Sequence, residues 1–380
     1  MFISFNRTKP FKMMFVLLIA ISLTLSFFAC APKDDLVEEE AEIAKNIILL
    51  IGDGMGFEQI NATRIYNDNE PLIMETLPYQ GAVTTNAYIK ELPTDSAAAG
   101  TALATGNKVI HFSVAMLGER ALKSITEYSM DAGKKTGIIS TKDITDATPA
   151  AFSSHAPNRS NEDIIIEGQI NSNIDLFMGQ GKSIYDPHAE RLISKGYSYL
   201  NTKAELESCD SQKIFAMFDS VTPDSEHSLA FLTQKALDTF SQNNDNGFFL
   251  MVEGSKIDSK CHSNDMDGML AEINAFDEAV NTALNFASAD ENTLIIVVAD
   301  HETGDLVLPA STTKEDLDDE LFHSSAHTSK KVPYFAYGPT AKDFLPEIEN
   351  TDIFVYMMSA FGLEITEPCQ TEYYVFPSAA

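Results

Sequence analysis

Three strongly apolar runs in this chain each end at a carboxylate. They span residues 46–52, 248–252 and 293–299, and the residues that follow them are Asp53, Glu253 and Asp300. Residues 294–298 are typical of a strand buried on both faces of a parallel sheet, and such sheets bind ligands at the carboxyl ends of their strands. One acid at a strand end is equally consistent with a cap for the next helix. Three acids at one sheet edge would repel each other unless a cation or a shared proton lay among them, so together they indicate a metal site.

The order of the predicted elements indicates an α/β fold. Further strand-like runs at residues 135–140, 213–218 and 332–338 alternate with helix-like segments. Apolar residues from Met269 to Leu284 recur at helical spacing, which predicts a helix with one face on the sheet. We therefore predict a three-layer sandwich in which helices flank a central, mainly parallel sheet. The segment 305–328 lacks clear periodicity and carries His323 and His327, as expected of an active-site loop.

The first thirty residues are typical of an export signal. Arg7, Lys9 and Lys12 precede an apolar stretch from Met13 to Ala29, and the segment contains no acidic residue. It ends at Phe28-Ala29-Cys30, which resembles the cleavage box of bacterial lipoproteins, in which the cysteine becomes the lipidated first residue. An uncleaved membrane anchor is the second interpretation. We expect an exported lipoprotein, either periplasmic or on the outer membrane or cell surface of a Gram-negative bacterium.

Composition divides the rest of the chain into a short tether and one domain. Residues 31–42 form an acidic tether, and no linker, low-complexity tract or repeat divides residues 43–380, so we predict a single domain there. Within the tether, Lys33-Asp34-Asp35 resembles the charged tag that directs some lipoproteins to the cell surface. A plain solvated tether is an equal interpretation.

The chain is strongly acidic. Its formal net charge of -30 argues against a nucleic-acid-binding surface. An anionic substrate would be repelled at long range, so bound cations and a few basic groups would have to reverse the field locally. Besides Cys30, the chain holds Cys209, Cys261 and Cys369. These cysteines allow at most one disulfide, and its pairing is open.

Ser96 lies where a polar cap meets an alanine-rich helix, in the segment from Thr94 to Thr101. A hydroxyl there would lie beside unpaired backbone N–H groups at the positive end of the helix, where an anion can bind. The same pattern is also a routine helix start. Arg159 could grip a phosphate with two parallel hydrogen bonds, although a single loop arginine is more often a surface residue.

Candidate metal ligands follow two of the predicted strands. They are Glu253, Asp258, His262, Asp300 and His301. Carboxylate and imidazole ligands together suit zinc. After the run at 135–140, Asp146 and Thr148 add oxygen groups of the kind that magnesium prefers.

The order of these motifs resembles the alkaline phosphatase family, in a bacterial and compact form. The motifs are residues 46–56, 94–98, 146–150 and 252–254, Asp300-His301 and His327-Thr328. The resemblance covers the whole chain after the signal and implies a metal-dependent phosphomonoester hydrolase that acts through a phosphoserine intermediate. It also implies two zinc ions, one magnesium ion, small phosphate monoesters as substrates, and a homodimer.

Carried over position by position, the resemblance implies a role for each motif residue. Ser96 would be the nucleophile, and Arg159 would hold two phosphate oxygens. One zinc would take Asp258, His262 and His327. The other zinc would take Asp53, Asp300 and His301. Magnesium would take Asp53, Glu253 and Thr148, and Asp146 would reach it through water.

Several positions leave alternatives open. Ser259 stands where bacterial relatives often carry lysine, tryptophan or histidine, and Lys260 could substitute in part. Cys261 could compete as a soft ligand, although a buried thiol fits better. His323 could replace His327 as a ligand, but the threonine that follows His327 matches the family better.

Other functions compete with phosphomonoester hydrolysis. A phosphodiesterase of the same superfamily usually lacks the third-metal group and often has threonine as nucleophile, so Ser96, Glu253 and Thr148 argue against it. A sulfatase needs proline at the place of Ala98. A non-catalytic envelope lipoprotein that binds phosphate or zinc should have lost a ligand, whereas every expected ligand type is present.

Overall fold

The computed structural model describes residues 43–242 and 244–372, which belong to one compact unit. The predicted signal peptide at 1–30, with Cys30, and the tether at 31–42 lie outside the described residues. Within the described ranges, no helix combines the length and the apolar character needed to cross a membrane.

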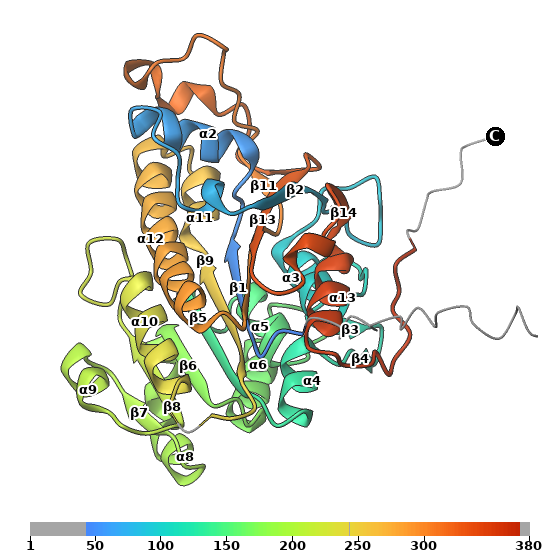
Figure 1. Cartoon of the computed structure of the whole chain (residues 1–380), viewed down its shortest axis with the longest axis vertical. Coiled ribbons are helices and arrows are strands. Elements are labelled where there is room, and N and C mark those ends of the chain that lie inside the picture. The colour runs from blue at the N-terminus through green and yellow to red at the C-terminus, as the bar shows by residue number, and fades with distance from the viewer. Residues whose placement is uncertain (1–42, 243, 373–380) are drawn as a thin grey trace, which may run out of the picture. The chain divides into compact units, whose positions relative to one another are not determined.

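A ten-stranded sheet forms the centre of this unit (Figure 1). Its strands, in spatial order, are β14 (Glu347–Glu349), β2 (Tyr79–Thr84), β13 (Val332–Tyr337), β10 (Thr293–Ala299), β1 (Asn46–Gly52), β9 (Phe248–Gly254), β5 (Lys135–Asp143), β6 (Leu176–Gln180), β8 (Ile214–Phe218) and β7 (Ser198–Leu200). Only β13 runs antiparallel to both of its neighbours among these strands. The prediction of an α/β fold with a mainly parallel sheet is confirmed.

Helices cover both faces of the sheet. On one face lie α10 (Leu229–Phe240) and α12 (Met266–Asp290), with α2 (Phe57–Tyr66) against α12. On the other face lie α3 (Ser96–Thr105), α4 (Ile125–Asp131), α5 (Ala147–Ser153), α6 (Glu162–Asn171) and α13 (Asn350–Ala360) (Figure 1). The three-layer arrangement is therefore the predicted one.

Shorter elements complete the described part of the chain. The other α-helices are α7 (Lys182–Tyr185), α8 (Ala189–Ser194), α9 (Lys203–Ser208) and α11 (Lys256–His262). The 3-10 helices are η1 (Met74–Thr76), η2 (Asp186–His188), η3 (Lys314–Asp316), η4 (Asp319–Leu321) and η5 (Ala341–Asp343). Two small ribbons pair β3 (Met116–Leu117) with β4 (Arg120–Ala121), and β11 (Glu302–Thr303) with β12 (His327–Thr328).

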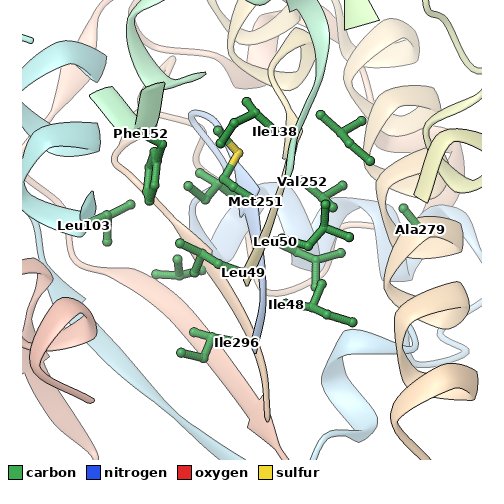
Figure 2. Packing of buried hydrophobic residues seen from close by; sticks show 14 of the residues in the cluster. Ile48, Leu49, Leu50, Leu103, Ile138, Phe152, Met251, Val252, Ala279 and Ile296 are labelled. Carbon is green, nitrogen blue, oxygen red and sulfur yellow. The ribbon is translucent and has the colours of Figure 1, made fainter. Parts of the chain in front are cut away.

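The central strands are apolar at successive positions because both of their faces are buried. Figure 2 shows Leu49 and Met251 directed toward Phe152 of α5, whereas Leu50 lies on the side of Ala279 of α12. Every residue of β1, β9 and β10 is buried. These three strands are neighbours, and Gly52 pairs with both Ala299 and Gly254. Their carboxyl ends therefore meet at one edge of the sheet.

Candidate active site

The ends of these adjacent strands bring buried acids and a histidine together. Asp53 follows β1, and Asp300 and His301 follow β10. The Nε2 atom of His301 lies 3.3 Å from Asp53 Oδ1 and 3.3 Å from Asp300 Oδ2. Glu253, the residue before last in β9, is also fully buried. The parallel register thus produces the cluster that the strand ends predicted.

Ser96 is the first residue of α3, and its hydroxyl oxygen lies 3.2 Å from His301 Nε2. Asp95 precedes it as the helix cap and accepts hydrogen bonds from the backbone N–H groups of Ala97 and Ala98. The alanines and Gly100 that follow leave the first turns of α3 fully buried. The nucleophile candidate therefore lies at the positive end of a buried helix, beside the acid cluster.

The protonation of His301 follows from its neighbour Thr303. The Thr303 hydroxyl donates its hydrogen to Asp258 Oδ1 at 2.7 Å, so it can only accept from His301 Nδ1, at 3.2 Å. The other ring nitrogen, Nε2, then carries a lone pair. It accepts from the Ser96 hydroxyl and also faces carboxylate oxygens, so the two acceptor types repel each other unless a cation lies between them.

In a second group, the rings of His262 and His327 are also oriented by hydrogen bonds at Nδ1. His262 Nδ1 donates to the carbonyl of Ser325 at 2.7 Å, and His327 Nδ1 donates to the carbonyl of Thr94 at 2.8 Å. When both rings are neutral, their Nε2 atoms present lone pairs, and these two atoms lie 3.0 Å apart. Asp258 Oδ1 lies 3.3 Å from one and 3.6 Å from the other. Imidazoles whose outer N–H groups are fixed by carbonyls, with a carboxylate beside them, form a donor set that suits zinc.

A third set consists of oxygen atoms. Glu253 Oε2 accepts from the Ser140 hydroxyl at 2.6 Å, while Glu253 Oε1 makes no hydrogen bond. The Thr148 hydroxyl, in the first turn of α5, is buried and also makes none. Such oxygen ligands are those that magnesium prefers.

Buried oxygens without hydrogen-bond partners mark this edge of the sheet. They are Asp53 Oδ1, Thr148 Oγ1, Glu253 Oε1 and Asp300 Oδ2. Burial raises the pKa of Glu253 to about 8, and burial together with the charge of Asp258 raises the pKa of Asp300 to about 7. Burial and the neighbouring carboxylates also raise the pKa of Asp53. Bound cations would satisfy these oxygens and favour their ionised forms, so the residues fit a metal centre.

Asp146 and Arg159 flank this centre. Arg159 Nη2 lies 2.5 Å from Asp146 Oδ1, and Arg159 Nη1 lies 3.7 Å from Asp95 Oδ2, next to Ser96. The other Asp146 oxygen is 2.9 Å from the ammonium of Lys142, a residue without a predicted role in the sequence. The fold thus brings the predicted arginine to the same end of α3 as the candidate nucleophile, while the individual roles of the site residues remain predictions.

The structure shows the positions of three residues whose roles the sequence left open. His323 is exposed, and it is His327 that joins Asp258 and His262. Cys261 is buried in the hydrophobic core, where burial raises the pKa of its thiol. Lys260 pairs with Asp265 at 2.6 Å, and its partial substitution for a basic residue at position 259 stays a prediction. Cys209, Cys261 and Cys369 are all free thiols.

The chain is similar to known proteins of a single family. The chain matches the family model for alkaline phosphatase over residues 44–317. Alkaline phosphatase 4 of Bacillus subtilis (strain 168) is 35% identical over 351 residues, which cover 83% of this chain and 74% of that protein. The alkaline phosphatase of Escherichia coli (strain K12) is 30% identical over 409 residues, which cover 84% of this chain and 87% of that protein. The chain belongs to the alkaline phosphatase family.

Solved alkaline phosphatases support the same fold. The enzyme of the Antarctic bacterium TAB5 is 32% identical, with a TM-score of 0.77 over 86% of this chain and 100% of that one. One variant of the TAB5 enzyme has magnesium bound in a site called M3. The alkaline-phosphatase-like fold predicted from the sequence is confirmed, and family membership makes this chain a phosphatase that acts on phosphate monoesters.

The site residues that were not predicted from the sequence form hydrogen bonds or ion pairs with the predicted ones. Thr303 fixes His301 and Asp258, Ser140 holds Glu253, and Lys142 holds Asp146. Thr303 belongs to the strand that begins directly after Asp300-His301, so its nearness in sequence was an available signal. The lysine offered no such signal, since a single charged residue at a strand end is ordinarily a solvated one.

Proposed function

We propose that this chain hydrolyses phosphate monoesters in a metal-dependent reaction, through a phosphoserine formed at Ser96. The observation that carries the proposal is the position of His301 Nε2, which lies 3.2 Å from the Ser96 hydroxyl and 3.3 Å from buried oxygens of Asp53 and Asp300. A serine hydroxyl is a weak nucleophile at its ordinary pKa and needs such surroundings to react.

The metal content proposed is two zinc ions and one magnesium ion. One zinc would be held by Asp258, His262 and His327; the other by Asp53, Asp300 and His301; and magnesium by Asp53, Glu253 and Thr148, with Asp146 acting through water. When bound, these cations supply positive charge that lowers the pKa of a hydroxyl or water and stabilises the charge of the transition state.

The chain's own residues position the reacting groups. Ser96 Oγ would attack phosphorus, forming the serine–phosphate bond while the bond to the departing alcohol breaks opposite it. Water would then attack the phosphoserine, releasing inorganic phosphate and restoring the Ser96 hydroxyl. Arg159, held beside Asp95, would donate to phosphate oxygens, and the N-terminus of α3 would favour the negative charge at Ser96.

The nucleophile is tested with p-nitrophenyl phosphate. We expect Ser96→Ala to lower kcat/KM roughly a thousandfold or more, and acid-quenched wild type to yield a peptide phosphorylated at Ser96. Ser129→Ala is the matched control, because Ser129 is also buried and its hydroxyl makes no hydrogen bond, yet it lies in α4. Near wild-type turnover by Ser96→Ala would refute the nucleophile.

The cofactors and the alternatives are tested on the same protein. Chelation should abolish turnover, zinc should restore most of it, and magnesium should add to the zinc-restored rate. Full activity in the stripped protein would contradict the scheme. A methyl phosphodiester cleaved faster than the monoester would favour a phosphodiesterase, and bound zinc without turnover on any phosphate ester would favour a capture protein.

We also propose that the chain is exported, lipidated at Cys30 and dimeric. The charged and apolar segment before Cys30 supports export, and the family resemblance supports a homodimer. Membrane fractionation of wild type and Cys30→Ala tests the anchor, since the variant should be released in soluble form. Light scattering of the protein from residue 43 onward tests the dimer, and a monomer mass would contradict it.

A further inference from the structure

Strand β5 is irregular at the point where it reaches the site. Its register with β6 shifts between Ser140 and Asp143, and this irregularity is called the bulge below. An irregularity of this kind can redirect a side chain. The backbone N–H of Lys142 donates to Ser140 Oγ at 3.1 Å, and the Ser140 hydroxyl donates to Glu253 Oε2 at 2.6 Å. The bulge is therefore fixed to a predicted magnesium ligand rather than being a loose strand end.

The bulge places a lysine against Asp146. Lys142 Nζ lies 2.9 Å from Asp146 Oδ2, while Arg159 Nη2 lies 2.5 Å from Asp146 Oδ1. Each oxygen of this carboxylate thus has its own cation. A free carboxylate beside an arginine tends to bind it through both oxygens, which would engage both terminal nitrogens of the guanidinium. With one oxygen held by Lys142, Arg159 keeps its Nη1 on the side of Asp95 and the nucleophile.

We propose that Lys142 is a positioning residue for phosphate binding. Together with the backbone N–H of Ala147, which donates to Asp146 Oδ1 at 2.7 Å, its ammonium holds Asp146 in the orientation that fixes Arg159 by one nitrogen and leaves the remaining guanidinium donors for the phosphate. This inference rests on the proposed function, because it assigns the phosphate to Arg159. It also gives the site a cation that Ser259 cannot provide.

The chain contains a matched control on the same strand. Lys135, at the other end of β5, pairs with Asp175 at 3.1 Å, and the side chains of that pair are 33% and 20% exposed. The corresponding exposures for Lys142 and Asp146 are 32% and 21%. Lys135→Met and Lys142→Met therefore remove the same charge from equivalent ion pairs, of which only one faces the site.

The experiment measures steady-state kinetics on p-nitrophenyl phosphate, competitive inhibition by inorganic phosphate, and the Tm of each variant. We expect Lys142→Met to raise KM and the phosphate inhibition constant about tenfold, with a smaller change in kcat, because the lost interaction positions a binding group. Lys142→Arg should recover most of the affinity, and Lys135→Met should leave both constants unchanged. If Lys142→Met does not fold, Lys142→Gln takes its place.

A double-mutant cycle separates positioning from direct contact. In an Asp146→Ala background, Lys142→Met should have no further effect on the phosphate constant, because the lysine acts through that carboxylate. Additive effects, or equal constants for Lys142→Met and Lys135→Met, would overturn the inference. Failure of the proposed function would instead appear as wild type without turnover, in which case calorimetric binding of inorganic phosphate to the same variants still tests Lys142.

Discussion

At the scale of single residues, the site depends on hydrogen bonds that decide which nitrogen of each imidazole is free. Thr303 is central to this, since its one hydroxyl accepts from His301 Nδ1 and donates to Asp258 Oδ1. It thereby connects the two candidate zinc groups. Partners of this kind orient ligands and raise their basicity, and removing them usually weakens metal binding or activity.

Replacing Thr303 by valine keeps its shape and removes both hydrogen bonds. We expect Thr303→Val to lower zinc affinity and kcat/KM by about 10- to 100-fold, as measured by competition with a zinc-binding dye and by turnover. Thr136→Val is the control, because Thr136 is equally buried and its hydroxyl makes no hydrogen bond. Equal behaviour of the two variants would show that Thr303 only fills space.

Three of the candidate ligands could be predicted from the sequence alone because each directly follows an apolar run. Asp53, Glu253 and Asp300 needed only the rule that parallel strands end at one edge. The carbonyl of Thr94, which receives His327 Nδ1, is 233 positions away along the chain. Backbone partners of this kind carry no side-chain signal, so the orientation of the rings could not be derived from the sequence.

At the scale of elements, one buried lysine attaches the segment after α3 to the start of α13. Lys108 has a fully buried side chain, and its ammonium donates to the Asn86 carbonyl, Asn350 Oδ1 and Glu349 Oε2 at 2.6 to 3.0 Å. Because α3 carries Ser96, this anchor also secures the layer that supports the nucleophile.

Lys108→Met should leave the buried Asn350 Oδ1, the partly buried Asn86 carbonyl and the Glu349 carboxylate without this donor. We expect a loss of roughly 3 kcal/mol in the free energy of unfolding, measured by urea denaturation. Lys123→Met is the comparison, since Lys123 pairs with an Asp131 that is 70% exposed, and surface pairs contribute about 0 to 1 kcal/mol. A similar small loss in both variants would mean that the Lys108 contacts add little to stability.

Most central elements could be predicted because their periodicity reflects burial. The strands that were missed are short or mixed in character. In β6, Gly179 interrupts an apolar run, and β2 exposes its first residues at the margin of the sheet. The antiparallel direction of β13 was not predicted either. The direction of a strand depends on the route of the preceding loop, and a buried apolar strand has the same residue pattern in either direction.

At the scale of the whole molecule, protons and metals compete for the same carboxylates. The pKa of Asp300 is raised to about 7 and that of Glu253 to about 8, chiefly by burial, whereas an unfolded carboxyl titrates near about 4. Between about pH 4 and pH 8, the folded metal-free chain therefore binds more protons than the unfolded chain. Its free energy of unfolding falls as pH rises through this range. His301, whose pKa burial lowers, opposes this trend only below about pH 6.5.

After chelation, the Tm should therefore decrease between about pH 6.5 and 8.5, and adding zinc and magnesium should raise it most at the upper end, because metals displace these protons. Glu253→Gln removes one titrating group and should flatten the decline. Calorimetry at each pH measures the effect. A metal-free Tm that rises across the window would show that these carboxyls are ionised in the fold without cations.

The acidity of the chain gives a last prediction at this scale. A net charge of -30 repels a phosphate dianion before it reaches the cations of the site, and salt screens such repulsion over about 10 Å at 0.1 M. We expect kcat/KM for p-nitrophenyl phosphate to rise a few-fold, by roughly 2 to 5, as sodium chloride increases from low to moderate concentration, while kcat changes little. Steady-state kinetics at constant viscosity measures it. A steady fall of kcat/KM with salt would instead mean that the local positive charge around Ser96 and Arg159 controls the approach of the substrate from the outset.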